Sequence, residues 1–544
     1  MLARATLEKA PARTKVHGIT GKNDAIIARG MSPLGDALFG IPARGGRQMI
    51  RTGQQYRDSL RDGRQVWING ERVPDVTVHP MFRPLVDVRA RIYDMAHEPA
   101  HAATMTYAAP SGADPSGAGD DAAGTLCSVG TKLPYTPEDW HAKRAAVDAV
   151  LDEIGGIVTR VGDETVGEMW SLFDGQDVLN EVNPRFSENI RRHVQRVVRE
   201  DPFHVSANTD PKGDRSKRPQ DQDPDMLLHV VKETDAGIIV RGAKYETAAA
   251  YANQAFTKPT IANWGDSQLS DYAVGFICNL SAPNLKFICR TGFAGRAPLE
   301  DYPLSNRFDE VDTLLIFDDV LIPWDDVLFY RHTKAATFIR ATLHRYSAFA
   351  FVQRNIRLAD FMIGAALFNV RQTGLDHQQA VQEKLALLAC YREGINAHLT
   401  AAIATAVRSP EGLLMPNQSL LMSGRVLASS QLHHMMHIAR ELCGGQICVT
   451  PDAAVFRDPE TAPWMEKFYT VNDSWQAEDR RKLLAFARDL LNSDYAGHRL
   501  TFQLFAQSPP YANLAAVYRN FNWDEALMVV QKSAGLSDRV RAGR

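Results

Sequence analysis

The sequence predicts an α+β fold in which a helical region, a mostly antiparallel β region and a helical bundle follow one another. Apolar residues recur at helical spacing in residues 51–200 and again in residues 333–544. Between them, residues 201–332 hold apolar runs of strand length that are separated by turn-forming residues. At 544 residues the chain is too long for a single core, so we expect these ranges to be domains behind an extension of residues 1–50.

Composition narrows the class of protein. Hydrophobic residues make up 45% and charged residues 23% of the chain, which is ordinary for a soluble globular protein. The net charge of −3 gives no sign of nucleic-acid binding, and no apolar run reaches the roughly 18 residues of a membrane span. We expect a cytoplasmic protein with reduced thiols, because the start of the chain lacks an apolar signal segment and the six cysteines are scattered.

The N-terminal extension is basic. Residues 1–51 carry nine Lys or Arg against three Asp or Glu. A nucleic-acid arm and a transit peptide both fit this charge. We favour an extension that wraps a neighbouring subunit or is partly mobile.

The first helical region begins with a clear helix signal. Thr52 to Leu60 predicts a short capped helix, and Asn69-Gly70 between two apolar runs predicts a hairpin with a type I′ turn. Thr136 followed by Pro137 and two acids predicts the start of a longer helix. Its buried stripe is expected to be Val147, Val150, Leu151 and Ile154.

Arg160 stands at the edge of a largely apolar segment. One interpretation is a surface arginine that pairs with Glu164, one helical turn later. The other is a guanidinium that points into a pocket and holds a phenolic or carboxylate oxygen. The residues alone leave both open.

The stretch Phe203–Lys217 is a turn-rich loop at the centre of the chain. It contains His204, a Pro-Lys-Gly turn and the cations Lys212, Arg215 and Lys217. Such a turn can hold an anionic cofactor with its backbone N–H groups and nearby bases. A solvated surface loop of mixed charge is the simpler interpretation of these residues alone.

Several strands are expected in the β region. Residues Gly237–Lys244 predict a strand, a turn and a second strand. Four further apolar runs predict single strands: Tyr272–Cys278, Leu285–Cys289, Thr313–Phe317 and Asp319–Pro323.

The last region is predicted to be mainly helical. Asp376 with Gln379 indicates a capping box, and Ser419–Leu442 predicts one helix that ends at Cys443-Gly444. His433 and His437 have the spacing of a zinc pair, but packing or a subunit contact is the better interpretation, so no metal is expected. Residues Gly444–Ile447 allow close backbone approach to a flat cofactor, although a plain helix cap fits as well.

Seven motifs together resemble the two-component, reduced-flavin-dependent aromatic hydroxylases, which include 4-hydroxyphenylacetate 3-monooxygenase and the chlorophenol and nitrophenol monooxygenases. The resemblance covers about residues 51–500 and implies an acyl-CoA dehydrogenase-like fold and a homotetramer. It rests on Thr52–Tyr56, Ser59–Arg64, His79–Arg83, Lys232–Lys244, Tyr302–Glu310, Leu321–Trp324 and Gly497–Arg499.

The resemblance also implies roles for individual residues. Arg160 and His204 match the catalytic residues that hold the phenol oxygen, and Ala262 with Asn263 matches the lining of the substrate pocket. The implied FAD-binding residues are His204, Val205, Ser206, Lys212, Gly213, Asp214, Arg215, Gly444, Gly445, Gln446 and Ile447.

Glu164 departs from the family pattern, which has tyrosine at this position. A carboxylate beside the substrate would disfavour an acidic side arm by like-charge repulsion. Either the local alignment shifts at this point or the pocket differs. For a different pocket, our hypothesis is that Glu164 suits a neutral phenol or an amino-bearing ring.

The implied reaction uses FADH₂ from a separate NAD(P)H-dependent reductase, together with O₂. A C4a-hydroperoxyflavin then hydroxylates an electron-rich aromatic ring. In that scheme Arg160 stabilises developing phenolate charge and His204 accepts or shares the proton. The chain has no Gly-x-Gly-x-x-Gly motif for a nicotinamide cofactor, which is consistent with a separate reductase.

Two other functions are considered. A 4-hydroxybutyryl-CoA dehydratase-like lyase would need an iron–sulfur cluster held by three cysteines and a histidine, but only Cys127 precedes residue 278. A non-catalytic flavin-binding assembly protein is kept open by Glu164. Saturable binding of reduced FAD would distinguish the hydroxylase from these alternatives.

Overall fold

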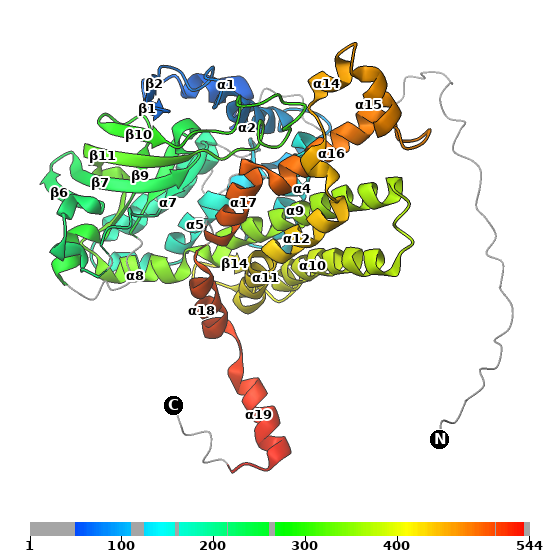
Figure 1. The fold of residues 1–544 in the computed structure, drawn as a ribbon. Helices are drawn as coiled ribbons and strands as arrows, with labels where there is room; N and C mark the ends of the chain where they lie inside the picture. The colour runs from blue at the N-terminus through cyan, green and yellow to red at the C-terminus, as the bar shows by residue number, and fades with distance from the viewer. Residues whose placement is uncertain are drawn as a thin grey trace, which may run out of the picture. The chain divides into compact units, whose positions relative to one another are not determined.

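Helices, then strands, then helices follow one another along the chain (Figure 1). The computed structural model describes residues 49–109, 124–157, 163–214, 216–259, 267–505 and 508–537. Of the predicted extension, residues 1–50, all but the last two lie outside this part. The described residues belong to one compact unit, residues 47–544.

The first region is mainly helical. Its elements are α1 Gly53–Ser59, β1 Gln65–Ile68, β2 Glu71–Val73, α2 Arg83–Met95, α3 Ala102–Met105, β3 Thr106–Ala108, β4 Leu126–Ser128, α4 Pro137–Ile154, α5 Asp163–Phe173, α6 Gln176–Asn180 and α7 Pro184–Glu200. Both predicted N-caps are confirmed, because Thr52 and Thr136 each form a capping box with the residue three positions later.

The predicted hairpin is also confirmed. β1 and β2 pair antiparallel across Asn69 and Gly70, which have φ of 54° and 77°. Positive φ at both central residues is what a type I′ turn requires.

Two sheets form the middle region. Its strands are β5 His204–Ala207, β6 His229–Thr234, β7 Gly237–Thr247, β8 Gln254–Thr257, β9 Val274–Asn279, β10 Leu285–Cys289, β11 Asp312–Pro323 and β12 Val327–Tyr330. One sheet has the order β2-β1-β10-β11-β7-β6 and the other β12-β9-β8-β5. Most pairs are antiparallel as expected, but β1–β10 and β5–β8 are parallel.

Two strand predictions were wrong in the same way, because each divided one long strand. β7 runs through Gly242, whose φ of 125° lets the strand continue where a turn was expected. β11 runs through a bulge between Phe317 and Val320, with Asp319 at a φ of 59°.

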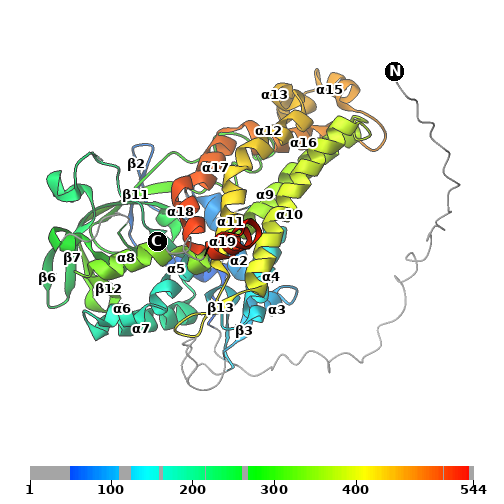
Figure 2. The ribbon, with the colours of Figure 1, turned by 90° about the horizontal axis from the view of Figure 1, so that it is seen from below.

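The last region is helical. Its elements are α8 Thr333–Thr342, α9 His344–Gln372, α10 Gln379–Ala404, β13 Val407–Arg408, β14 Leu414–Met415, α11 Gln418–Ser430, α12 Leu432–Cys443, α13 Gln446–Val449, α14 Ala453–Arg457, α15 Ala462–Tyr469, α16 Ala477–Asn492, α17 Asp494–Phe505, α18 Pro510–Asn520 and α19 Trp523–Ala534. The long helix α9 packs against α5, α10, α11 and α12 (Figure 2).

Two helix predictions in this region need correction. The expected helix over Ser419–Leu442 is two helices that meet at Gln431. The expected capping box at Asp376 is absent, since Gln378 is the N-cap of α10 and forms no side-chain cap bond. Gly444 ends α12 with a φ of 71°, as predicted.

Within the described residues, no helix is both long enough and apolar enough to span a bilayer.

Candidate functional site

Three buried polar side chains from different elements meet beside β5. Lys258 donates from Nζ to Glu168 Oε2 at 2.8 Å and to Ser206 Oγ at 2.5 Å, and the Ser206 hydroxyl donates to Glu168. Lys258 and Glu168 are almost fully buried, so each charge depends on the other for compensation. The cluster links α5, β5 and the residue after β8.

A backbone contact holds the same elements together at His204. The Thr165 hydroxyl on α5 donates to the His204 carbonyl at 2.5 Å. β5 itself is buried along its whole length and pairs in parallel with β8, with His204 opposite Gln254. The backbone of His204 is therefore held by both α5 and β8.

His204 carries the strongest signal of a ligand-binding site. Both of its ring nitrogens are buried and have no hydrogen-bond partner in the part of the chain that the structure describes. The same is true of His193, whose ring meets the His204 ring edge-on at 5.6 Å. Buried polar groups are normally paired, so an orphaned imidazole indicates a missing ligand or water.

Burial and charge keep this histidine neutral. Desolvation, followed by the nearby Lys258 ammonium, lowers the pKa of His204 to about 3. The pKa of His193 also falls well below its ordinary value, first because of burial and then because of His204. A neutral imidazole has one donor and one acceptor nitrogen and can bond a hydroxyl.

A cleft opens next to this cluster, with a volume of about 690 Å³. Its walls come from the loop after β5, the end of β8, the α8–α9 junction and the start of α18. The described lining residues are Asn208, Thr209, Lys212, Lys258, Pro259, Ile339, Arg340, Leu343, His344, Phe505, Ser508, Pro509, Tyr511 and Ala512.

A second hollow of about 360 Å³ adjoins the cleft through Asn208, Thr209 and Phe505. Glu168 and Ser206 line it, so the buried charge cluster lies between the two spaces. Pockets of this size accommodate most of a small organic ligand.

The loop that follows β5 is anchored by another buried ion pair. Lys244 Nζ lies 2.5 Å from Asp210 Oδ1 and donates to the Lys258 carbonyl at 2.9 Å. Burial lowers the pKa of Lys244, and Asp210 opposes this shift. The pair joins β7 to both strands that border the site.

The predicted cofactor residues of this loop divide into two groups. Val205 and Ser206 are buried in β5, whereas Lys212, Gly213 and Asp214 are exposed beyond it. Lys212 lines the cleft, and Gly213 has a φ of +51°. Asp214 accepts from Ser216, and these bonds lower its pKa.

Four other predicted site residues lie outside the described residues: Arg160, Arg215, Ala262 and Asn263. For Glu164 the structure gives only the backbone, which is part of α5. The roles predicted for them remain predictions.

Gly444–Ile447 lie far from His204 in this chain. They follow α12, next to the carboxyl end of α9, where Asn369 donates to the Leu442 and Cys443 carbonyls. The cleft lies at the opposite end of α9, at His344. At 1.5 Å per residue, the segment of α9 from His344 to Asn369 is about 37 Å long. The structure therefore does not bring these four residues to the cleft.

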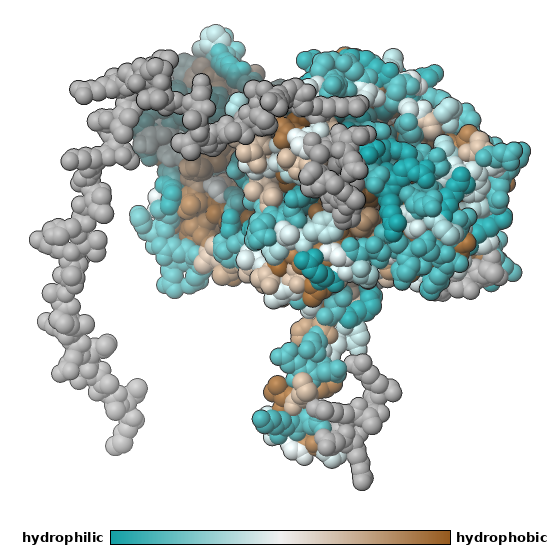
Figure 3. Space-filling view, turned by 180° about the vertical axis from the view of Figure 1, so that it is seen from behind, coloured by the Kyte–Doolittle hydropathy of each residue, from teal (hydrophilic) through white to brown (hydrophobic). Residues whose placement is uncertain are grey.

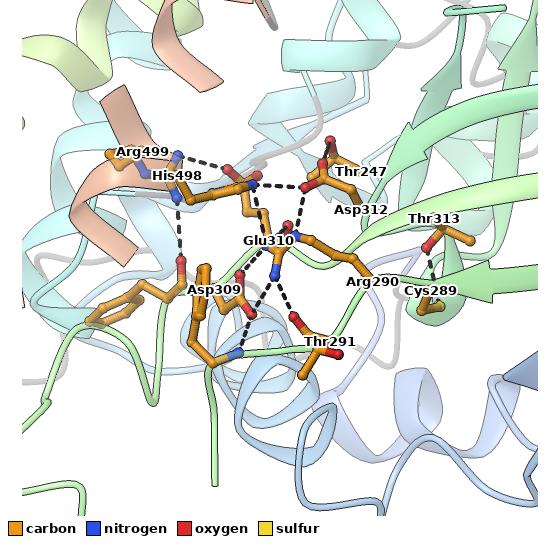
Figure 4. A network of polar contacts seen from close by, with 12 residues as sticks. Thr247, Cys289, Arg290, Thr291, Asp309, Glu310, Asp312, Thr313, His498 and Arg499 are labelled. Carbon is orange, nitrogen blue, oxygen red and sulfur yellow. Dashed lines mark hydrogen bonds and ion pairs between the residues drawn. The ribbon is translucent and has the colours of Figure 1, made fainter. Parts of the chain in front are cut away.

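A polar network joins the second hollow to α17 (Figure 4). His498 Nε2 lies 2.8 Å from Asp312 Oδ2, and Arg290 binds both Asp309 and Asp312. Although burial raises the pKa of Asp312, the hydrogen bonds from His498 and Arg290 hold it well below its ordinary value. Asp312 and His498 both line the hollow.

A second ion pair of this network is fully enclosed. Arg499 Nη1 lies 3.0 Å from Glu310 Oε2, and both side chains are 2% exposed. The paired charges fasten α17 to the loop before β11.

Sequence reasoning missed four residues of the site: Glu168, Lys258, Asp312 and His498. Glu168 stands in the apolar segment Val166–Phe173, and Lys258 directly follows the buried strand β8. A charge inside a buried segment was the available signal, because such charges need a partner.

The buried cysteines lie apart from one another in the fold. Cys127, Cys278, Cys289 and Cys443 are buried on different elements. Among the described residues, no group of three or more His, Cys, Asp or Glu side chains could hold a metal ion.

Comparison with known proteins matches this arrangement to one family. Residues 52–329 match the 4-hydroxyphenylacetate 3-hydroxylase N-terminal family, and residues 333–535 match its C-terminal counterpart. The chain therefore belongs to the 4-hydroxyphenylacetate 3-hydroxylase family, and the α+β fold expected from the sequence is confirmed.

Individual relatives are distant in sequence but match along most of their length. The oxygenase component of 4-hydroxyphenylacetate 3-monooxygenase from Thermus thermophilus is 28% identical over 87% of this chain and 95% of that protein. The oxygenase component of 4-nitrophenol 2-monooxygenase from a Rhodococcus species is 30% identical over 83% of this chain and 85% of that protein.

A solved structure supports the same assignment. The FAD complex of the oxygenase component of 4-hydroxyphenylacetate 3-monooxygenase is 27% identical and superposes with a TM-score of 0.80. The superposition covers 89% of this chain and 99% of the chain in the solved structure.

Proposed function

We propose that this protein is the oxygenase component of a two-component flavin monooxygenase, which hydroxylates a phenolic or related electron-rich aromatic ring with reduced FAD and O₂. The observation that carries this proposal is the His204 imidazole, which is buried without a hydrogen-bond partner among the described residues and lies near Lys258, a residue of the cleft lining, in a chain of this family. Bound reduced FAD would supply, with O₂, the oxygen that enters the ring.

In this proposal, His204 binds the phenolic hydroxyl. Because its pKa is lowered to about 3, the imidazole is neutral at working pH and offers one acceptor nitrogen to the phenol proton. We assign Arg160 the complementary role of stabilising the negative charge that builds up on the phenol oxygen, while the proton stays shared between that oxygen and His204. Glu164, Ala262 and Asn263 are proposed to line the rest of the substrate pocket.

The cleft suits an anionic flavin nucleotide. Its described lining includes Lys212, Arg340 and Lys258, the last of which is paired with Glu168, and no aspartate or glutamate is among the lining residues that the structure describes. Three described residues of the loop that follows β5 line this cleft, Asn208, Thr209 and Lys212, which supports the flavin-binding role proposed for this loop. A site of one charge sign attracts an anion.

The remaining predicted flavin contacts, Gly444–Gln446 and Ile447, can belong to the same site only through a second copy of the chain. Their distance from the cleft along α9 supports the proposed homotetramer, in which one copy presents this segment to another. The exposed apolar helix α19, none of whose residues is buried, gives a second reason to expect assembly.

The reducing equivalents are proposed to come from a separate flavin reductase, as the term oxygenase component implies for the relatives. We also propose a cytoplasmic location, because all six cysteines are free thiols.

The test is to mix the purified protein anaerobically with FADH₂, add O₂ and follow the absorbance of the flavin. The proposal expects the return of oxidised FAD to be delayed relative to free FADH₂, and a panel of phenols to yield hydroxylated products. A return as fast as without protein, with no hydroxylated product, would contradict the proposed function.

A further inference from the structure

A basic groove of about 620 Å³ adjoins the cleft. It lies between the α8–α9 junction, α11 and α18, and α18 packs against α11 (Figure 2). The groove and the cleft share five lining residues, so the two spaces are continuous: Arg340, His344, Ser508, Tyr511 and Ala512.

The charge of the groove is strongly one-sided. Its lining includes Arg340, Arg345, Arg425 and Arg519, whereas none of its described lining residues is an aspartate or a glutamate. A hollow lined by one sign of charge concentrates the electrostatic field and attracts the opposite ion.

Two of these arginines have no carboxylate partner. In the described part of the chain, Arg345 and Arg519 form no ion pair. Arg345 instead lies over the Phe338 ring, and its charge acts on Asp174, whose carboxylate is already hydrogen-bonded to Tyr346 and Ser409. Their guanidinium groups therefore keep donors available for a ligand.

A third arginine is buried at the floor of the groove. Arg425 is 2% exposed, and burial lowers its pKa to about 9 while Glu168 acts in the opposite direction. A bound anion would add a favourable interaction with this charge. Guanidinium groups bind phosphate through paired hydrogen bonds, more strongly than they bind neutral acceptors.

We propose that this groove is a phosphate-binding site for a ligand whose other end lies in the adjoining cleft. The inference rests on the proposed function, which fills the cleft with flavin and phenol. Two sources of the phosphate share this chemistry: the diphosphate of FAD, and a phosphate-bearing tail on the aromatic substrate.

The experiment compares wild type with Arg345→Gln/Arg519→Gln, and uses Arg371→Gln as a matched control. Arg371 is an exposed arginine near the far end of α9, away from the groove. Anaerobic calorimetry gives dissociation constants for reduced FAD, reduced riboflavin, which has no phosphate, and coenzyme A, which carries phosphates on a flexible tail. Each titration is repeated at two salt concentrations.

We expect the double variant to bind reduced FAD or coenzyme A at least about tenfold more weakly and with a smaller salt dependence. Riboflavin binding and the Arg371→Gln control should not change. Weaker binding of FAD alone identifies the cofactor as the source of the phosphate, and weaker binding of coenzyme A identifies the substrate tail. A double Lys variant at the same positions should recover part of the affinity.

Unchanged FAD binding, with no coenzyme A binding to either protein, would overturn the inference and leave the proposed function intact if hydroxylation persists. A double variant that changes the sedimentation of the protein but no ligand affinity would also overturn it, since the groove would then be a subunit contact. Failure of wild type to bind reduced FAD would contradict the proposed function itself.

Discussion

At the scale of single residues, the site depends on charges held out of water. Lys258 is compensated by Glu168 and Ser206, and its ammonium, together with burial, keeps His204 neutral. The lysine therefore helps to hold β5 against α5, and it adds to the larger effect of burial that keeps the imidazole neutral. Any change to this cluster should affect both stability and phenol binding.

The first prediction concerns the pH dependence of stability. An unfolded histidine binds a proton below about pH 6.5, whereas folded His204 stays neutral down to about pH 3. The unfolded chain thus binds more protons than the folded chain in this window. As the pH is lowered from 6.5, the free energy of unfolding therefore decreases by about 1.4 kcal/mol per pH unit on account of this side chain. We expect His204→Asn to shrink the drop in thermal midpoint between pH 7 and pH 5, measured by calorimetry.

The matched control for that measurement is His437→Asn, because His437 is exposed on α12. It should leave the drop unchanged. An equal drop in wild type and His204→Asn would show that His204 is not the neutral, buried group described above.

The sequence pointed to His204 only with the help of the family motifs. It did not predict which side chains surround His204 in the fold. Glu168 and Lys258 are far apart in the chain, and only the packing of α5 against β5 brings them together. A local pattern contains no information about such a pair. The sequence shows that Glu168 and Lys258 are charges in or next to apolar segments, but it does not show that they pair with each other.

At the scale of elements, local signals predicted where helices begin but not where long elements bend. Thr52 and Thr136 fix helix starts through hydrogen bonds within four residues, which a sequence displays directly. The break at Gln431 and the bulge in β11 depend on the neighbouring elements. Strand and helix interruptions of this kind were therefore misread.

The second prediction concerns the close packing at the end of α4. A Cβ on Gly156 would lie 2.4 Å from the ring of buried Phe308, so Gly156→Ala must displace that ring or the helix end. We expect it to destabilise the protein by about 1–3 kcal/mol, seen as a lower thermal midpoint.

Gly364→Ala in α9 is the matched control, because a Cβ there meets no atom within 4 Å. A glycine in a helix interior costs about 0.5–1 kcal/mol relative to alanine, so this variant should be slightly more stable. The prediction fails if both substitutions shift the midpoint in the same direction.

At the scale of the whole molecule, the helix α9 separates two exposed apolar surfaces. Trp464 and Phe468 on α15, with Phe368, lie towards its carboxyl end. At the other end α19 exposes Trp523 and Leu527, and Figure 3 shows apolar residues on this projecting helix. Uncovered apolar surface of this kind usually marks a contact with another chain.

The third prediction follows from α19. A chain that stops after residue 521 loses this helix and should sediment as a smaller assembly than the full chain in analytical ultracentrifugation. Asp524→Asn/Lys532→Gln changes only charged residues of α19 and should leave the assembly intact. Identical sedimentation of the truncated and full-length chains would rule out α19 as an assembly contact.

The parallel pairing of β1 with β10 also sets the order of events during synthesis. Gln65 takes its place in the sheet beside Lys286, so the β1–β2 hairpin must wait for a partner that the ribosome makes much later. At typical synthesis rates the delay is roughly ten to forty seconds. A lone hairpin is marginally stable in water, and its unpaired edge can recruit another nascent chain. Until β10 has been made, the β1–β2 hairpin is therefore a segment that a chaperone would protect from such pairing.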